Sequence, residues 1–235
     1  MNKVLITGAS RRLGLFLTEQ FLAENWQVHA LTRHASPELN KLSCSHLTLH
    51  EIGNYDEQSV QHFISSYQLQ NDTLDLVLHN ASIYETDDSL SIRGPEFYLA
   101  LMHIHMMLPA LLTHGLLPEL KAVNGNIISI TDIYADNPNP DYGLYCSTKA
   151  GLQSLTLGFA KKFAPEIRAN CIQPGPIKFL DNHSDKHKSN VLRETLLATE
   201  GGFEPIYKTV KFILDNNYVT GDCIKVDGGR SLVRG

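Results

Sequence analysis

The chain has 235 residues, of which 43% are hydrophobic and 19% are charged, and its formal net charge is −5. This length and apolar content suit one α/β domain spanning 1–235 with a substantial buried core. An acidic balance without clustered Lys and Arg argues against a nucleic-acid partner, because phosphate binding depends on such clusters. We therefore expect the partner to be a small molecule.

The first residues predict a strand over 3–7 and not the basic and then long apolar sections of a secretory signal. Continuous apolar runs approaching about 18 residues are absent from the sequence, so we expect no membrane partner and a cytoplasmic location. Isolated cysteines without a Cys-x-x-Cys pair predict free thiols. They are Cys44, Cys146, Cys171 and Cys223.

Short apolar runs alternate with helix-length stretches along the chain. The run 4–6 ends in Thr-Gly, and apolar residues at helical spacing follow over 13–23. Further strands are predicted near 27–32, 46–49, 74–78, 125–130, 167–172 and 222–226. This alternation predicts a single Rossmann-like, doubly wound domain with a mostly seven-stranded parallel sheet. Functional residues should lie just after the strands.

The pattern is weakest over 179–203, a polar stretch that we interpret as a mobile flap over the substrate. His183 and His187 within it have a spacing that could bind a metal on a helix. In a polar flap this interpretation is poor, and we predict no metal.

A tight turn joins the first predicted strand to the first predicted helix. Two glycines bracket it, and the start of the helix exposes backbone N–H groups that can bind a pyrophosphate. An ordinary strand-to-helix turn is the alternative. The candidate cofactor residues here are Thr7, Gly8, Arg11, Arg12, Leu13 and Gly14.

The second predicted strand ends at Arg33, where a site for NAD commonly has an acidic residue that holds the ribose 2′-hydroxyl. A guanidinium suits a 2′-phosphate, which a carboxylate would repel. Arg33, together with Arg12 in the turn, therefore predicts NADPH as the cofactor.

Tyr145 and Lys149 follow the fifth predicted strand at i, i+4 spacing. On a helix this spacing places both side chains on one face, so the ammonium can lower the pKa of the phenol and hold the nicotinamide ribose. A tyrosine in that setting is a usable acid near neutral pH. A pair on a helix surface without function is the alternative.

With these motifs the chain resembles the short-chain dehydrogenase/reductase family. The resemblance rests on 7–14, 79–82, 145–149, 174–175 and 226–229. It implies an oxidoreductase in which both Tyr145 and Lys149 are catalytic and contact the cofactor. It also implies cofactor contacts at Asn80, Ala81, Ser82, Pro174 and Gly175. The threonine that the family usually has after the Pro-Gly pair is missing.

Asp132 stands thirteen residues before Tyr145, at a position where most members of the family that this chain resembles have a serine. A carboxylate opposes the negative charge that develops on a carbonyl oxygen during hydride addition. Beside a tyrosine it can instead relay a proton, or accept hydrogen bonds from ring N–H groups. Asp132 therefore favours an imine-containing heterocycle, and we count it as catalytic.

This arrangement is similar to that of the pteridine reductases, and of bacterial dihydromonapterin reductases in particular. Arg12 stands where other relatives usually have glycine, and Tyr84 resembles the ring that sandwiches a pterin against the nicotinamide. The resemblance implies an NADPH-dependent dihydropterin reductase, with dihydrofolate as a further substrate of some members. The candidate substrate-binding residues are Arg12, Ser82, Tyr84, Asp132 and Tyr145.

Two other functions stay open at this stage. One is a carbonyl reductase of the same family acting on a sugar, a steroid or an acyl thioester; the other is a non-enzymatic NADP(H) sensor. His105 replaces an asparagine that supports a proton relay in the wider family, and could be a proton carrier or a packed residue. Apolar helices over 95–120 and 145–165 predict a homodimer or homotetramer.

Overall fold

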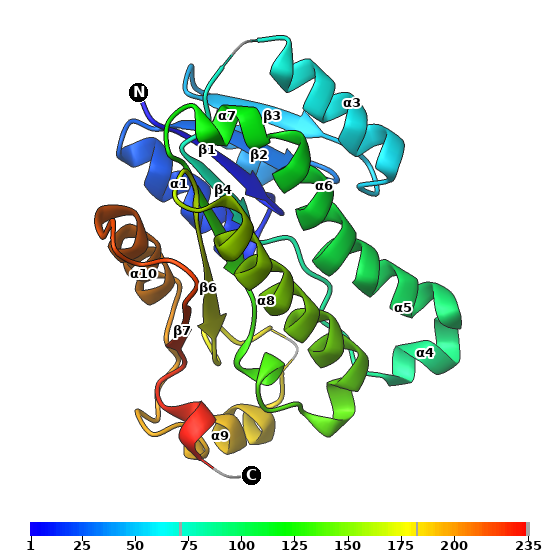
Figure 1. Ribbon diagram of the computed structural model, residues 1–235. Helices are drawn as coiled ribbons and strands as arrows, with labels where there is room; N and C mark the ends of the chain where they lie inside the picture. Colours follow the sequence, from blue (N-terminus) through cyan, green and yellow to red (C-terminus); the bar gives the residue numbers. More distant parts are fainter. Residues whose placement is uncertain (71, 182, 234–235) are drawn as a thin grey trace.

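The computed structural model describes residues 1–70, 72–181 and 183–233. In this part of the chain seven parallel strands form one sheet, in the order β3-β2-β1-β4-β5-β6-β7 (Figure 1). The strands are β1 (Lys3–Thr7), β2 (Gln27–Thr32), β3 (Leu47–Glu51), β4 (Leu76–His79), β5 (Asn126–Ile130), β6 (Arg168–Pro174) and β7 (Cys223–Val226). The predicted doubly wound fold is confirmed. The strand order reverses between β1 and β4, which is where such sheets bind ligands.

Helices cover both faces of the sheet (Figure 1). One face is covered by α1 (Arg12–Ala23), α2 (Pro37–Lys41) and α10 (Glu204–Asp215). The other is covered by α3 (Glu57–Gln68), α6 (Leu108–Gly115), α7 (Leu117–Lys121) and α8 (Gly143–Phe163). The remaining elements are α4 (Asp88–Arg93), α5 (Pro95–Met102), η1 (His103–Met107), η2 (Ile133–Ala135), η3 (Pro140–Tyr142), α9 (Asp185–Arg193) and η4 (Arg230–Leu232).

Each face of the sheet has its own apolar core because strand side chains alternate between faces. In β1, Leu5 packs into the core beneath α3, α6 and α8, while Val4 and Ile6 pack beneath α1 and α10. All three are fully buried. The central positions of a strand buried on both faces are all apolar, which is why Val4, Leu5 and Ile6 form a continuous apolar run.

The helical run Pro95–Gly115 comprises α5, the π-helical turn η1 and α6. By length and composition alone it could cross a membrane, with a mean hydropathy of 1.2 over 18 residues. The sequence expectation concerned continuous apolar runs, and histidines and a threonine keep those of this segment well short of about 18 residues. The buried side chains of the run, including Ile104, Leu108 and Leu112, belong to the core beside α8.

The polar segment 179–203 contains the helix α9, which the sequence pattern did not predict. Ser184 caps this helix, since its hydroxyl accepts a hydrogen bond from the backbone N–H of His187 at 3.2 Å. Asp185 lies in the first turn, where a negative charge favours the helix. Polar residues with a good cap can therefore form a short helix in which no side chain is fully buried.

Candidate active site

A pocket of about 2030 Å³ opens at the carboxyl ends of the strands. The loops after β1, β2, β4, β5 and β6 line it, together with α9 and Arg230 of the C-terminal turn. Pockets for one drug-sized ligand measure roughly 300–1,000 Å³, so this pocket has room for a dinucleotide and a second molecule. Its place matches the reversal of strand order.

The turn after β1 is closely packed. Gly8 has φ +69°, and a Cβ on Gly14 would lie 2.1 Å from the carbonyl oxygen of Gly8, so neither position accepts another residue without distortion. The start of α1 has no side-chain cap, which leaves its first N–H groups available to an anion. This geometry fits the predicted phosphate-binding turn.

Two side chains stabilise this turn through hydrogen bonds. Thr7 is buried and does not line the pocket; its hydroxyl accepts the backbone N–H groups of Asn80 and Ala81 at 2.9 and 3.0 Å. Its predicted role as a direct cofactor contact is therefore corrected to support of the turn. Tyr55, which sequence reasoning missed, accepts from the N–H of Gly8 at 3.3 Å and donates to Leu31 O at 3.1 Å.

Arg12 begins α1 with φ +51°, a conformation that is unfavourable for a side chain of this size. Its guanidinium donates to the backbone oxygens of Lys178 and Phe179 at 2.5 and 3.5 Å. Arg12 therefore ties the turn to the segment that follows β6, while it lines the pocket. Arg11 and Arg33 also line the pocket and are exposed.

The segment after β4 brings Asn80, Ala81 and Ser82 to the pocket. The side-chain amide of Asn80 donates to Thr7 O at 3.1 Å, which joins the ends of β1 and β4. On the far side, Pro174 and Gly175 line the pocket after β6. A Cβ on Gly175 would lie 2.7 Å from Asp227 Cα, so this close approach also requires glycine.

Tyr145 and Lys149 lie one turn apart on α8, and both are buried, with exposed fractions of 4% and 2%. The Tyr145 hydroxyl donates to Asp132 Oδ2 at 2.8 Å. The other carboxylate oxygen of Asp132 accepts the N–H of Tyr134 at 2.9 Å, which orients it at the start of η2. Lys149 Nζ donates to Ile130 O at 2.9 Å. The structure thus brings the three predicted catalytic side chains together.

The electrostatics of this cluster differ from the sequence expectation. Burial, followed by the charge of Asp132, raises the pKa of Tyr145 well above its ordinary value. The expectation that Lys149 acidifies the phenol is therefore wrong for the chain alone, because Lys149 bonds to Ile130 O while Asp132 bonds directly to the hydroxyl. Tyr145 is a protonated hydrogen-bond donor.

Burial also shifts the pKa values of Asp132 and Lys149. It raises the pKa of Asp132, although the hydrogen bonds from Tyr134 N and Tyr145 and the charge of Lys149 oppose the change. It lowers the pKa of Lys149 to about 8, against the influence of Asp132. Both groups therefore titrate closer to neutral pH than exposed residues of their kind, as proton-transfer groups need.

An aromatic wall closes one side of the pocket. Tyr84 stacks on Tyr142, with ring centroids 4.6 Å apart and an interplanar angle of 11°, and it meets Tyr145 edge-on at 5.0 Å. Tyr84 remains 45% exposed, so one face can still receive a flat ring. Sequence reasoning missed Tyr142, although its position three residues before Tyr145 on the turn leading into α8 was a possible signal.

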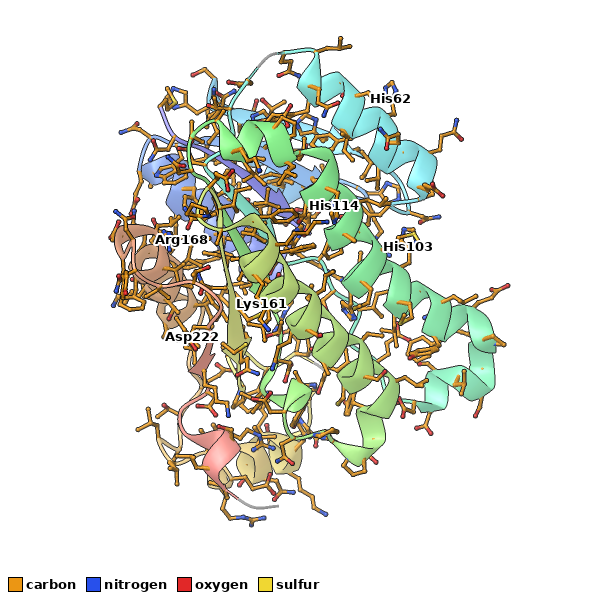
Figure 2. The ribbon with its side chains drawn as sticks, in the orientation of Figure 1. His62, His103, His114, Lys161, Arg168 and Asp222 are labelled. Carbon is orange, nitrogen blue, oxygen red and sulfur yellow. The ribbon has the colours of Figure 1, made fainter. Side chains whose placement is uncertain are left out.

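His105 lies on η1 behind Tyr145, fully buried, with the two rings edge-to-face at 5.6 Å. Gly151 lets η1 approach α8, since a Cβ there would lie 2.6 Å from Met106 Sδ. His103, which is labelled in Figure 2, belongs to the same turn. It contacts the backbone oxygen of Tyr55 and so joins η1 to the support of the glycine turn. Histidines of η1 therefore contact both ends of the site.

His183 and His187 lie in the segment 179–203, with ring centroids 4.5 Å apart. Among residues 1–70, 72–181 and 183–233, no group of three or more His, Cys, Asp or Glu side chains is placed to hold a metal ion. Both histidines line the pocket, as do Phe179, Leu180 and Glu194. Residues 179–180, His183 and the side of α9 that carries His187 thus form one wall of the site.

The fold and the site define a class of protein, the dehydrogenases and reductases that bind a nicotinamide dinucleotide. Comparison with known families agrees, because the profile described as enoyl-(acyl carrier protein) reductase matches residues 8–231. The chain belongs to the short-chain dehydrogenase/reductase family, as its motifs predicted. It is an oxidoreductase that uses a nicotinamide cofactor.

The chain is similar to the dihydromonapterin reductases of Enterobacter sp. (strain 638) and Klebsiella pneumoniae subsp. pneumoniae. It is 29% identical to each over 232 residues, which are 97% of this chain and 96% of each relative. A short-chain dehydrogenase from Leptospira borgpetersenii with bound NAD+ is 26% identical, with a TM-score of 0.88 over 98% of this chain and 92% of that one. A 4-hydroxyisoleucine dehydrogenase in complex with NADH, 20% identical over the whole of both chains with a TM-score of 0.88, shares the fold.

Proposed function

We propose that the chain reduces a dihydropterin, 7,8-dihydromonapterin or a close relative, to its tetrahydro form with NADPH. The observation that supports this most directly is the 2.8 Å hydrogen bond from the Tyr145 hydroxyl to Asp132. It places a carboxyl group beside the proton-donating tyrosine at the base of the pocket. The similarity to dihydromonapterin reductases points to the same substrate class.

A carboxylate at this position discriminates between reductions at carbon–oxygen and carbon–nitrogen bonds. Hydride addition to a ketone places negative charge on oxygen, which the charge of Asp132 would oppose. Reduction of a C=N bond leaves a basic nitrogen that must take up a proton, and Tyr145 holds a proton next to Asp132. The pocket therefore suits a nitrogen heterocycle.

The residues around the glycine turn fit a dinucleotide. The uncapped start of α1 suits the pyrophosphate, and Arg33, Arg11 and Arg12 provide positive charge for the 2′-phosphate of NADPH. We assign the remaining cofactor contacts to Lys149, Asn80 and Gly175, which line the pocket. When bound, the nicotinamide supplies the hydride.

The side chains of this chain then have separate tasks. Tyr84 provides an aromatic face for the pterin ring. Asp132 accepts hydrogen bonds from ring N–H groups and orients the Tyr145 hydroxyl. Tyr145 delivers the proton, and Lys149 stabilises the charge of Asp132. Each of these buried catalytic groups has a hydrogen-bond partner, which also argues against a sensor that has lost its catalytic activity.

Assembly and location are part of the same proposal. Large apolar side chains stay exposed along α5 and η1, at Leu99 (65%), Met102 (38%) and Met107 (45%). Burial of this surface against another copy would produce the homodimer or homotetramer expected from the sequence. We place the enzyme in the cytoplasm, where pterins and NADPH are available.

The test is a panel of substrates followed by NADPH oxidation. Dihydromonapterin, dihydrobiopterin, dihydrofolate, an acetoacetyl thioester and an enoyl thioester are compared in parallel with NADPH and with NADH. We expect the highest kcat/KM for a dihydropterin with NADPH. A preference for either thioester would support the carbonyl or enoyl reductase alternative, and binding of NADPH without turnover of any substrate would support the sensor.

A further inference from the structure

We infer that His105 determines substrate specificity by fixing Ser82 as a hydrogen-bond acceptor toward the pocket, so that the site selects a ring with N–H or amino donors. The inference rests on the proposed function, which names a nitrogen heterocycle as substrate. The observation behind it is a series of hydrogen bonds that leads from Ser82 through His105 and Thr148 to the backbone of Tyr145.

This series of hydrogen bonds runs from the pocket into the core. Ser82 Oγ, exposed in the pocket, lies 2.8 Å from His105 Nε2. His105 Nδ1 lies 2.8 Å from Thr148 Oγ1. Thr148 Oγ1 in turn lies 2.9 Å from the carbonyl oxygen of Tyr145. His105 and Thr148 are buried, so water does not compete for these bonds.

Counting protons along this chain fixes its direction. The carbonyl of Tyr145 can only accept, so the single hydroxyl proton of Thr148 is donated to it. Thr148 Oγ1 must then accept from His105, which places a proton on Nδ1. A neutral imidazole has one N–H, so Nε2 is an acceptor and takes the proton of Ser82.

The neutral state of His105 follows from its surroundings. Burial, with the positive charge of Lys149 as a smaller cause, lowers its pKa well below the ordinary value. The Tyr145 ring, edge-on at 5.6 Å, adds no charge of its own. In the opposite direction Thr148 would give up its 2.9 Å hydrogen bond to Tyr145 O, and the acceptor for Ser82 within the described part of the protein would be the carbonyl of Ile83, at 3.4 Å. The shorter bonds favour the first direction.

The consequence lies in the pocket. With its only proton directed at His105, Ser82 presents lone pairs to a bound molecule. Asp132, which lines the same pocket, also presents acceptors. A ring with N–H or amino groups can donate to both, whereas a substrate that offers only carbonyl oxygens would place its acceptors against the acceptors of Ser82 and Asp132. His105 thus acts through Ser82 as a positioning residue.

The tautomer is tested first, by NMR of protein labelled with ¹⁵N-histidine. The His105 signals are assigned by their loss in His105→Leu, with His62→Leu as control because His62 is exposed on α3 (Figure 2). We expect an imidazole that is neutral at neutral pH, with the proton on Nδ1. A proton on Nε2, or a charged ring, would overturn the inference whatever the enzyme reduces.

The kinetic test compares Ser82→Ala, His105→Leu and the double variant. Each single variant should lower kcat/KM for the dihydropterin about tenfold, mainly through KM, and the double variant should lose no more than either, because the two residues act as one unit. NADPH affinity, measured by titration, should stay near the wild-type value in His105→Leu. Additive losses, or no loss in either single variant, would overturn the inference. A wild-type enzyme that reduces no dihydropterin would instead overturn the proposed function, while the NMR result would still stand.

Discussion

Replacing Asp132 by asparagine keeps the size of the side chain and removes its charge. The amide oxygen of the variant can still accept from the Tyr145 hydroxyl, which lies 2.8 Å from Asp132 Oδ2 in the wild type, but the bond becomes a neutral one. Hydrogen bonds to charged groups contribute about 1.5–3 kcal/mol and neutral ones about 0.5–1.5 kcal/mol. Transfer of the ring proton should also become harder, because the carboxyl group no longer takes part.

The expected loss follows from these magnitudes. A difference of about 1–2 kcal/mol in orienting Tyr145 corresponds to roughly 5- to 30-fold in rate at about 1.36 kcal/mol per factor of ten. Loss of acid–base assistance adds a factor on the order of 100 if Asp132 relays the proton. We therefore expect kcat for the dihydropterin to fall at least about fivefold, and more than about 100-fold if Asp132 relays the proton.

The pH dependence gives an independent check. The charge of Asp132 raises the pKa of Tyr145, so its removal should lower that pKa. In the proposed mechanism Tyr145 acts in its protonated form, so activity should be lost as pH rises through its pKa, and the alkaline limb of kcat should move to lower pH in Asp132→Asn. The matched control is Asp136→Asn, an exposed carboxylate four residues along the same loop. Unchanged kcat and an unchanged alkaline limb in Asp132→Asn would refute the reasoning.

Three further predictions concern the cofactor and the aromatic wall. Arg33→Ala should weaken NADPH binding about tenfold and NADH binding little, because a charge-assisted bond to the 2′-phosphate is lost; equal losses in calorimetric titration would count against the assignment. The pKa of Lys149 is lowered to about 8, so its ammonium is lost as pH rises through that value and kcat/KM of the wild type should decline there. Lys149→Arg stays charged and should not show this decline, and a decline of kcat/KM at the same pH in the variant would contradict the assignment. Tyr142→Ala removes the ring stacked on Tyr84 and should raise KM for the dihydropterin about fivefold with a smaller change in kcat, and an unchanged KM would show that the stack does not order the wall.

The sequence was sufficient for the architecture because local patterns determine it. Each strand of a sheet covered on both faces is a continuous apolar run, and helix-length connections between such runs leave few topologies. The predicted strand at 27–32 coincides with β2, and the other strands agree within about two residues. The proximity of Tyr145, Lys149 and Asp132 also followed, since two lie on one helix and the third follows the neighbouring strand.

The features that sequence reasoning missed depend on tertiary contacts. Tyr55 comes from the loop after β3 yet holds the turn after β1, and no pattern near Tyr55 indicates this partner. Tyr142 stacks on a residue 58 positions earlier, brought there by the fold. The wrong expectation for the pKa of Tyr145 has the same origin, because spacing cannot show that Lys149 bonds to Ile130 O. Burial and hydrogen-bond partners decide these properties.

The central claim is that the carboxyl group of Asp132 adapts the site to nitrogen heterocycles. The most direct measurement is NADPH oxidation by wild type and Asp132→Ser with a dihydropterin and an acetoacetyl thioester side by side. We predict that the serine variant loses most dihydropterin turnover and gains activity on the ketone, since a hydroxyl can donate to the developing oxyanion. Full dihydropterin turnover in Asp132→Ser, with no gain on the ketone, would contradict it.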